Sequence, residues 1–327
     1  MNLTKKHYMA ITVGLITLLF IPFFLYMPIE ISGNPVGNIP MLVLYNGLLA
    51  FTVAALVVFG LMLVTKKEYM KEQLYTFSRF RHLILLMVKH NFITRYRRSV
   101  LGILWSVLNP LLTMLIMTLV FSTLFRFEVA NFPLYVLSGQ LVFGFFSEAS
   151  SQAMVSITGS GTIIKRIYVP KYIYPLTQVL SGVINIGFAL IAFIIVFIFT
   201  SQAVSWTVLL IPIPILYTFV FALGIGMLLS SVMVFFRDIG YIYGVGITLW
   251  MFLSAIMYPV EILPPRIYHL IHLNPLFHYI SFFRDLTLNG TIPGLWANII
   301  CIGFALAALC AGVYAVMSQQ DKYILYL

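Results

Sequence analysis

Long apolar runs dominate this sequence and restrict what it can fold into. A helix needs about 20 apolar residues to cross the roughly 30 Å core of a bilayer, and lipid offers no hydrogen-bonding partner to a backbone that is not helical. Only 9% of the residues are charged, against roughly 25% in a soluble domain. The sequence therefore predicts an all-α integral membrane protein with eight spans, near residues 9–27, 41–65, 101–125, 132–155, 173–200, 206–235, 240–258 and 293–317.

The basic residues orient these spans. Short cytoplasmic loops carry the excess of Lys and Arg in membrane proteins. With the N-terminus inside, all 19 basic residues except Arg126, Arg266 and Arg284 lie on the cytoplasmic side. The even number of spans places both termini in the cytoplasm, and the formal net charge of +10 needs no nucleic acid to explain it.

A polar stretch at residues 66–98 separates an N-terminal transmembrane hairpin, residues 1–65, from a six-span body, residues 99–327. One face of a helix through this stretch is apolar, and the opposite face is polar and basic. Such a basic amphipathic helix is typical of the membrane interface. It either only anchors the chain on anionic lipid or acts as a lever against a cytoplasmic partner. The apolar face holds Phe77, Phe80, Leu83, Ile84, Met87 and Val88, and the polar face holds Ser78, Arg79, His82, Lys89 and His90.

The cytoplasmic loop at residues 159–171 contains a second short amphipathic stretch. Gly159 and Gly161 indicate the end of one helix, and Pro170 restricts the start of the next. Lys165 and Arg166 are expected to be exposed. The loop either only marks the cytoplasmic side or binds a partner.

Residues 259–292 are too polar and too rich in proline to span, yet too apolar for a solvated loop. Irregular backbone survives at membrane depth only where protein or a water-filled cavity covers it. We therefore predict a re-entrant helical hairpin on the outer side, with its turn near Asn274-Pro275. His269, His272 and His278 lack a carboxylate or cysteine companion, which favours packing over a metal site.

Glu148 lies within a predicted span, where a carboxylate is costly and marks a functional site by default. The alternatives are that it is protonated or pairs with a neighbouring helix. Aromatic residues crowd the outer ends of the spans, either as the ordinary interfacial belt or as a surface on which sugar rings stack. They are Phe125, Phe127, Phe132, Tyr135, Phe143, Phe145, Phe146, Tyr258, Tyr268, Phe277, Tyr279, Phe282 and Phe283.

No G-x-x-x-x-G-K-[ST] loop occurs, so the chain is not expected to bind ATP through a P-loop. The G-x-S-x-G and H-E-x-x-H motifs of hydrolases and metalloproteases are also absent. The chain is therefore expected not to be an enzyme and to hold no cofactor or metal of its own, and its basic helix and the loop around Lys165 point to a partner as the source of energy.

Four stretches in order resemble the membrane permeases of type-2 ABC transporters that export polysaccharides such as O-antigen, capsule and teichoic acid. The match covers roughly residues 76–320. The stretches are Arg95-Tyr96-Arg97-Arg98-Ser99-Val100-Leu101-Gly102-Ile103-Leu104-Trp105 running on to Asn109-Pro110-Leu111, then Ile163-Ile164-Lys165-Arg166-Ile167-Tyr168-Val169-Pro170, then Phe236-Arg237-Asp238-Ile239, and finally Tyr258-Pro259 through Asn274-Pro275 to Arg284.

This resemblance implies a homodimer in a bacterial plasma (inner) membrane, with two copies of a separate ATPase that carries ATP and Mg. A lipid-linked glycan would pass between the permeases along body spans one, two and five. The resemblance also assigns expected roles to residues. Coupling to the ATPase falls to Ile164, Lys165, Arg166, Ile167, Tyr168 and Pro170; the substrate head-group site to Arg95, Arg97, Arg98, Trp105 and Asn109; and the outer gate to Tyr258, Pro259, Asn274, Pro275 and Arg284.

The chain departs from the family pattern in three places. Residues 1–65 add a hairpin to the usual six spans, Ala255 stands where proline is frequent, and Val169 where phenylalanine is usual. Two rival functions remain at this point. The same architecture could export a drug or small lipid. An ion-coupled carrier or a membrane-embedded transferase would want several intramembrane acidic or His groups, and only Glu148 qualifies.

Overall fold

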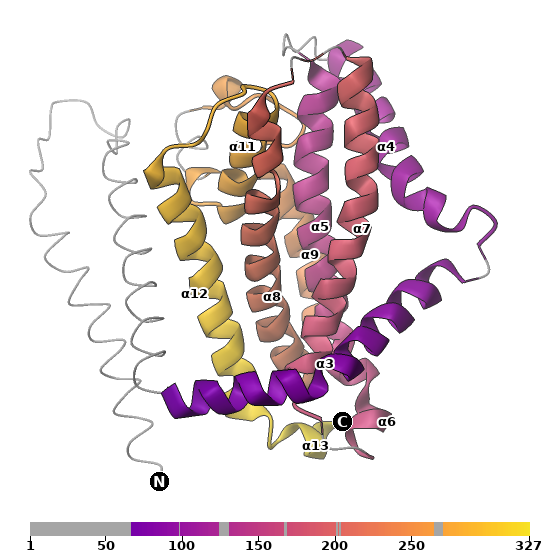
Figure 1. Cartoon of the computed structure of the whole chain (residues 1–327), viewed down its shortest axis with the longest axis vertical. Helices are drawn as coiled ribbons and strands as arrows, with labels where there is room; N and C mark the ends of the chain where they lie inside the picture. Colours follow the sequence, from indigo (N-terminus) through magenta and orange to yellow (C-terminus); the bar gives the residue numbers. More distant parts are fainter. Residues whose placement is uncertain are drawn as a thin grey trace, which may run out of the picture.

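The computed structural model describes residues 67–97, 99–123, 131–166, 169–200, 202, 204–264 and 271–327, with the backbone alone at 67–76, 123 and 261. The predicted hairpin at residues 1–65 lies outside these ranges. Every regular element within them is helical, which confirms the predicted class (Figure 1). The α-helices are α3 (Lys67–Tyr96), α4 (Trp105–Thr123), α5 (Phe132–Gly159), α6 (Gly161–Ile164), α7 (Ile173–Phe199), α8 (Pro212–Phe235), α9 (Ile239–Phe252), α11 (Pro275–Thr287), α12 (Leu295–Gln319) and α13 (Tyr323–Tyr326). Short 3-10 turns lie at Gly102–Leu104, Trp206–Leu210 and Val260–Ile262.

Four segments in the described ranges are long and apolar enough to cross a membrane. They are Gly102–Ser122, Ile173–Phe199, Trp206–Phe235 and Leu295–Gln319. They coincide with four of the predicted spans, because a long apolar run has no other stable form in lipid.

α5 is the central helix of the body. It packs against α4, α7, α8 and α11, and 17 of its 28 residues are buried. Its length corresponds to about 42 Å, enough to span a bilayer. Because protein covers most of its surface, α5 tolerates the Ser, Gln and Glu residues that make it less apolar than α4, α7 and α8.

α8 and α12 touch backbone to backbone. A Cβ atom on Gly224 would lie 2.3 Å from the carbonyl carbon of Ala308, and one on Gly312 would lie 2.1 Å from the carbonyl oxygen of Gly224. In lipid, helix association depends on this kind of close approach by small residues. These two glycines therefore fix the distance between two of the candidate spans.

α9 is shorter than the span predicted at residues 240–258. It has 14 residues, or about 21 Å, which falls short of the roughly 30 Å hydrocarbon core. The chain leaves the helix after Phe252, and Ala255 adopts a left-handed conformation with φ 48°. Side chains from α5 and α11 then bond the carbonyl groups that an ordinary helix would satisfy internally, as described below.

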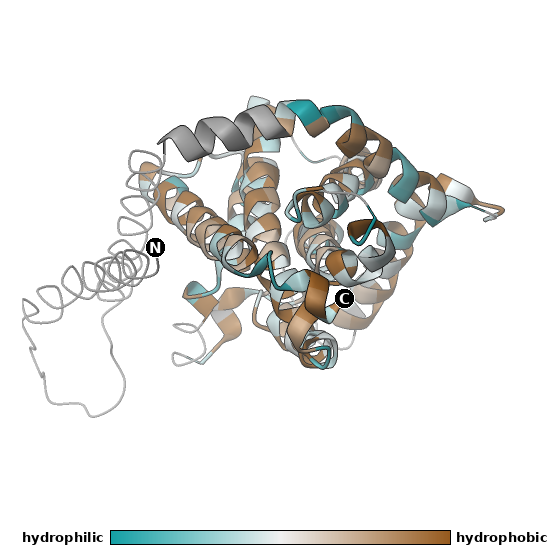
Figure 2. Ribbon diagram, turned by 90° about the horizontal axis from the view of Figure 1, so that it is seen from below, coloured by the Kyte–Doolittle hydropathy of each residue, from teal (hydrophilic) through white to brown (hydrophobic). Residues whose placement is uncertain are grey.

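In Figure 1 the first half of α3 runs across the lower end of the body, and its second half rises toward the right, to the point where the chain turns into α4. The predicted apolar face from Phe80 to Val88 packs on the body, with Ile84 buried, whereas Phe77 is exposed. All five residues of the predicted polar face are exposed. Figure 2, viewed from below, shows teal and brown segments along α3, as expected of an amphipathic helix lying against an apolar body.

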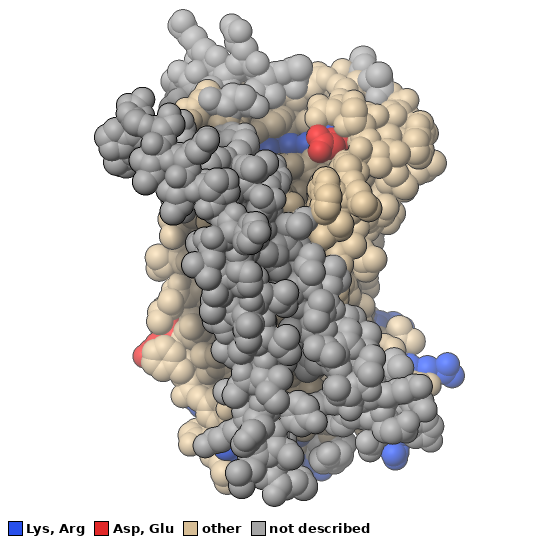
Figure 3. All heavy atoms as spheres, turned by 90° about the vertical axis from the view of Figure 1, so that its left-hand side faces the viewer, with Lys and Arg blue, Asp and Glu red and all other residues tan. Residues whose placement is uncertain are grey.

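The lower end of the body is basic. Lys165 and Arg166 directly after α6, Arg237 in the turn after α8 and Lys322 directly before α13 are all exposed there. Figure 3 shows the Lys and Arg side chains of one face gathered mainly around this end.

Most of the aromatic residues predicted to form a belt or a sugar-stacking surface are buried in the core. Neither interpretation holds for the buried rings that pack against neighbouring helices in the core. Phe146, for example, stacks on Phe221 with centroids 5.3 Å apart. The buried members are Phe132, Phe143, Phe145, Phe146, Phe277, Tyr279, Phe282 and Phe283. Two others are half-buried, Tyr135 and Tyr258. The remaining three lie outside the described residues: Phe125, Phe127 and Tyr268.

Candidate functional site

A cavity of about 700 Å³ lies between the end of α3, the first half of α4, the middle of α5 and α7, and the segment that follows α9. Its wall is mixed in character, with apolar residues such as Phe143 and Met257 beside polar ones. The polar members are Arg95, Tyr96, Ser106, Asn109, Thr113, Gln140, Glu148 and Asn185.

Arg95 and Glu148 form an ion pair in this cavity. Arg95 lies in the last turn of α3, and Glu148 lies in the middle of α5. Asn185 of α7 donates its amide hydrogen to the same carboxylate oxygen over 2.8 Å. The arginine and glutamate side chains remain 38% and 34% exposed, so the pair can be reached from the cavity.

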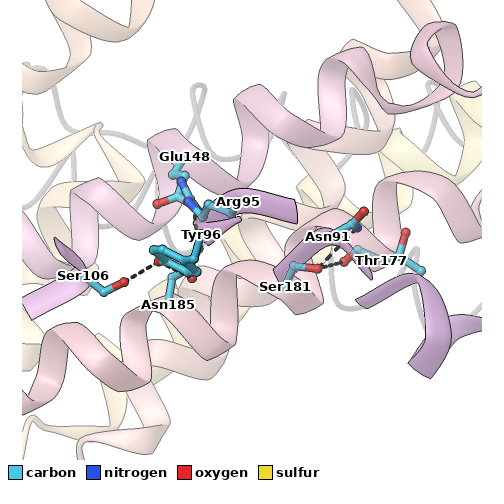
Figure 4. Close-up of polar contacts among 8 residues, drawn as sticks. All are labelled: Asn91, Arg95, Tyr96, Ser106, Glu148, Thr177, Ser181 and Asn185. Atoms are coloured by element: carbon cyan, nitrogen blue, oxygen red, sulfur yellow. Dashed lines mark hydrogen bonds and ion pairs between the residues drawn. The ribbon is translucent and has the colours of Figure 1, made fainter. Parts of the chain in front are cut away.

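Tyr96 ties the same corner together (Figure 4). Its hydroxyl donates to the side-chain oxygen of Asn185 over 3.2 Å and also hydrogen-bonds Ser106 at the start of α4. One turn earlier in α3, Asn91 donates to Ser181 of α7 over 3.4 Å. The C-terminal half of α3 is therefore fixed to α7, and Arg95 is held at the cavity rather than free on a mobile end.

A second polar cluster holds the broken segment after α9. The Arg284 guanidinium of α11 donates to the carbonyl groups of Ala255 (3.0 Å), Ile256 (3.2 Å) and Tyr135 (3.1 Å) and to the hydroxyl of Ser138 (3.3 Å). Arginine suits this position because its planar group carries five donors. The contacts explain how irregular backbone persists within an apolar body.

Asn274 supports the other end of that segment. Its side-chain oxygen accepts from the Leu276 backbone N–H over 3.0 Å, which caps α11, and from the Trp250 indole over 2.7 Å. Its amide donates to the carbonyl of Leu253 (3.0 Å) and to the hydroxyl of Ser254 (2.8 Å). Asn274 is thus saturated with partners and links α11 to the end of α9.

The histidines at this end take part in packing. His278 hydrogen-bonds the carbonyl of His272 over 2.7 Å and stacks on Phe304, and His272 packs against Phe277. His269 lies outside the described residues. Among the described residues no group of three or more His, Cys, Asp and Glu side chains could hold a metal ion.

At the lower end, the residues predicted for coupling begin at the last residue of α6, Ile164, and continue into the loop that follows it. Lys165 and Arg166 are exposed, as is Ile163, whereas Ile164 and Lys171 are buried. Burial lowers the pKa of the Lys171 ammonium, so this residue belongs to the packed part of the loop. Pro170 is half-buried, and Ile167 and Tyr168 lie outside the described residues.

The C-terminal helix α13 links α6 to α8. The Tyr323 hydroxyl donates to Ser231 of α8 over 2.7 Å, and Tyr326 packs edge-on against Phe235. On its other side, a Cβ atom on Gly161 would lie 3.7 Å from the side chain of Leu327. α6 therefore rests on the C-terminal segment rather than projecting alone.

The model of the family described as ABC-2 type transporter matches residues 82–288, which is more than half of the sequence. The chain belongs to the ABC-2 type transporter family. The matched region runs from α3 to the end of α11 and so includes the cavity, α6 and the segment held by Arg284.

Several curated relatives of this ABC-2 chain are named for the polysaccharide that they transport. An O-antigen export system permease protein RfbA of Klebsiella pneumoniae is 28% identical over 247 residues, covering 74% of this chain and 95% of the relative. A protein of the same name from Myxococcus xanthus is 26% identical over 247 residues, covering 75% and 95%. The polysialic acid transport protein KpsM of Escherichia coli is 23% identical over 244 residues, covering 71% and 91%.

The structure brings together residues of this ABC-2 chain that were predicted as two separate sites. Arg95, Trp105 and Asn109, predicted for the substrate head-group, line one cavity with Glu148, which was singled out only as an acidic residue in a span. Arg97 is exposed and does not line the cavity, and Arg98 lies outside the described residues. Glu148 takes the second of its alternatives, because it pairs with a neighbouring helix.

Asn185 and Gln140 of this ABC-2 chain were not predicted as site residues. Each is a single polar residue in an otherwise apolar part of α5 or α7, and both line the cavity. Isolated amides within candidate membrane helices were the available signal, because such groups are costly in lipid unless they meet a partner.

Proposed function

We propose that this chain is the membrane permease subunit of an ATP-driven exporter that moves a lipid-linked polysaccharide from the cytoplasm to the outer face of the membrane. The observation that carries the proposal is the alignment with O-antigen export permeases over 95% of their length. The Arg-containing cavity beside α4 and α5 supplies a site of suitable chemistry. The glycan itself, whether O-antigen, capsule or teichoic acid, is a matter for experiment.

The proposed energy source is a separate ATPase that docks on the lower, basic end and holds ATP and Mg. Ile163 on α6 and Lys165 and Arg166 directly after it are exposed, and they suit a protein surface that binds through one apolar and two basic contacts. With this end in the cytoplasm, the excess of Lys and Arg follows the positive-inside rule. Motion of α6 would reach α8 through α13. It would reach α5 directly, since α6 follows α5 after a single residue.

The proposed assembly contains two copies of this chain and two of the ATPase. α9 has no buried residue, and only 6% of the apolar window of α4 is buried within the chain. These two helices flank the cavity and leave apolar faces that lipid or a second copy can cover. The second copy is favoured because a path between two permeases would then run beside the cavity.

Arg95, Trp105 and Asn109 are proposed to receive the head-group of the lipid-linked substrate. Guanidinium groups bind phosphate in a bidentate manner with charge-assisted hydrogen bonds, and Arg95 is accessible from the cavity. Arg97, exposed on the same turn of chain, and Arg98 are proposed to attract the anionic head-group toward it.

Tyr258, Pro259, Asn274, Pro275 and Arg284 are proposed to form the outer gate. The segment they hold is irregular and ends the short helix α9, so it can change shape without breaking a continuous span. The hydrogen bonds of Arg284 and Asn274 describe its closed arrangement.

Export of a drug or small lipid is not favoured, because the relatives are named for polysaccharide transport. An ion-coupled carrier is also disfavoured, since Glu148 is paired with Arg95 rather than free to carry a proton. The test is ATPase stimulation of the purified complex: a glycan-loaded lipid should raise the rate, and small amphiphiles should not. Equal stimulation by both would contradict the polysaccharide assignment.

A further inference from the structure

We propose that Glu148 is a displaceable counter-ion, which occupies Arg95 in the resting state and yields it to the phosphate of the substrate lipid. This inference rests on the proposed function, and it assigns to Glu148 a role in selecting what can bind. A ligand must then compete with a carboxylate for the guanidinium, so neutral and weakly anionic lipids fail at this step.

The geometry around Arg95 suits an exchange of partners. Among the described residues, Glu148 is the sole polar partner of the Arg95 side chain. A guanidinium carries five N–H donors, so most of them remain available to a second anion. The side chain is 38% exposed toward a cavity of about 700 Å³, which leaves room for a phosphate group to approach.

Asn185 makes the displacement less costly for Glu148. A carboxylate that loses its only partner at membrane depth would be strongly destabilised. Here the Asn185 amide already donates to the carboxylate oxygen that meets Arg95, over 2.8 Å. The carboxylate therefore keeps a hydrogen bond after Arg95 has turned to the ligand.

Asn185 is itself held in position by the Tyr96 hydroxyl, which donates to its side-chain oxygen over 3.2 Å. This contact fixes which end of the amide faces Glu148, because the oxygen is occupied and the NH₂ group must point to the carboxylate. Tyr96 and Asn185 thus form a support for the displaced state that does not involve Arg95.

The cavity contains a further polar group in want of a partner. The side-chain oxygen of Gln140 is buried and makes no hydrogen bond within the described residues, and Gln140 lines the same cavity. A buried polar atom without a partner is unfavourable by roughly 1–3 kcal/mol. The oxygen is covered in this arrangement, so a shift of the Gln140 side chain toward the cavity would be needed before a ligand hydroxyl could donate to it.

A lipid diphosphate can displace Glu148 from Arg95, whereas a ligand carboxylate would bind the guanidinium no more strongly than Glu148 does. A diphosphate carries more negative charge than one carboxylate and offers several oxygens for bidentate contact. Solvent reaches both members of the ion pair, which are 38% and 34% exposed, and it weakens the attraction of either anion to Arg95. The larger charge and the additional oxygens of the diphosphate therefore decide which anion binds the guanidinium.

The sign of one substitution distinguishes a counter-ion from a structural brace. Glu148→Gln keeps the shape and the hydrogen bond from Asn185 but removes the competing charge. If Glu148 competes with the ligand, this substitution strengthens binding; if the ion pair only braces α3 against α5, the substitution weakens it.

The experiment measures equilibrium binding of a radiolabelled long-chain isoprenyl diphosphate to the full chain with its ATPase in phosphatidylcholine nanodiscs. We expect Glu148→Gln to bind about tenfold more tightly than the wild type, and Arg95→Gln at least tenfold more weakly. The double variant should match Arg95→Gln, because the counter-ion has no effect once the cation is gone. Asp285→Asn removes a half-buried carboxylate outside the cavity and serves as the matched control, with no expected change.

Unchanged or weaker binding by Glu148→Gln overturns the proposal. If Arg95→Gln fails to fold, the Glu148→Gln result decides by itself. The neutral isoprenol of equal length tests whether the phosphates matter, and it should not bind to any variant. The exporter assignment fails separately: it is decided by the presence of the ATPase in the purified complex, which the Glu148 variants leave unchanged.

Discussion

The Arg284 guanidinium lies over the ring of Tyr135, with its carbon 3.5 Å from the ring centroid. The same group donates to the Tyr135 carbonyl over 3.1 Å, and the Tyr135 hydroxyl reaches the carbonyl of Tyr258 over 3.0 Å. α11, the start of α5 and the segment after α9 are therefore joined through two side chains. Cation–π stacking of this kind strengthens where water is excluded.

Replacing Arg284 should destabilise the observed arrangement of this segment. Arg284→Ala removes donors from three carbonyl groups, and we expect a loss of roughly 2–4 kcal/mol. Arg284→Lys should recover only part of it, since an ammonium lacks the planar fork. The thermal midpoint of the detergent-purified protein is the measurement, and a midpoint for Arg284→Ala equal to that of the wild type would show that the cluster contributes nothing.

Gly224 should tolerate no side chain. Gly224→Ala places a Cβ atom 2.3 Å from the Ala308 backbone, so α8 and α12 must separate, and we expect a low yield of folded protein. Gly187→Ala is the matched control, because nothing lies within 4 Å of its added Cβ atom. Alanine favours a helix by about 1 kcal/mol over glycine, so the control should be slightly stabilised. Similar yields for both variants would contradict the backbone contact.

The link from α13 to α8 should matter for coupling. Tyr323→Phe removes one hydrogen bond to Ser231, worth about 1 kcal/mol, and should be mild. Tyr323→Ala removes the whole buried ring and should reduce both α6 order and the amount of ATPase retained on purification. Immunoblotting of the co-purified ATPase measures the effect, and full retention by Tyr323→Ala would separate α13 from coupling.

Substitutions of the basic residues near the cavity should differ in how strongly they reduce glycan export. Arg95→Ala should abolish export of the glycan to the cell surface, because it removes the guanidinium that lines the cavity. Arg97→Ala plus Arg98→Ala should reduce export while assembly with the ATPase persists. Surface labelling of the glycan in a complemented deletion strain measures both. Unchanged export in the double variant would remove these two arginines from the head-group role.

The sequence predicted the long helices well and their polar contacts poorly. α7, predicted at residues 173–200, occupies Ile173–Phe199, because hydropathy alone determines where such a run can end. The early end of α9 was missed, since it depends on Arg284 and Asn274, which follow it by more than 20 residues. A local pattern of apolar residues carries no record of such tertiary partners.

The candidate site was predicted as separate parts. The resemblance pointed to Arg95 and the cost of a carboxylate in a span pointed to Glu148, yet nothing in the sequence paired them across 53 positions. The pairing arises because α3 climbs the body instead of remaining flat along its whole length (Figure 1). Asn185 gained its role from the same geometry, because its amide bonds both Tyr96 at the end of α3 and Glu148 of α5.

The central claim is that a separate ATPase drives this permease through α6. Its most direct test is affinity purification of the tagged chain from native membranes, with mass spectrometry of the co-purifying proteins, for the wild type and for Lys165→Glu plus Arg166→Glu. The account predicts a stoichiometric partner with a P-loop on the wild type and its loss from the double variant. A wild-type chain that purifies under gentle detergent without any nucleotide-hydrolysing partner would contradict the account.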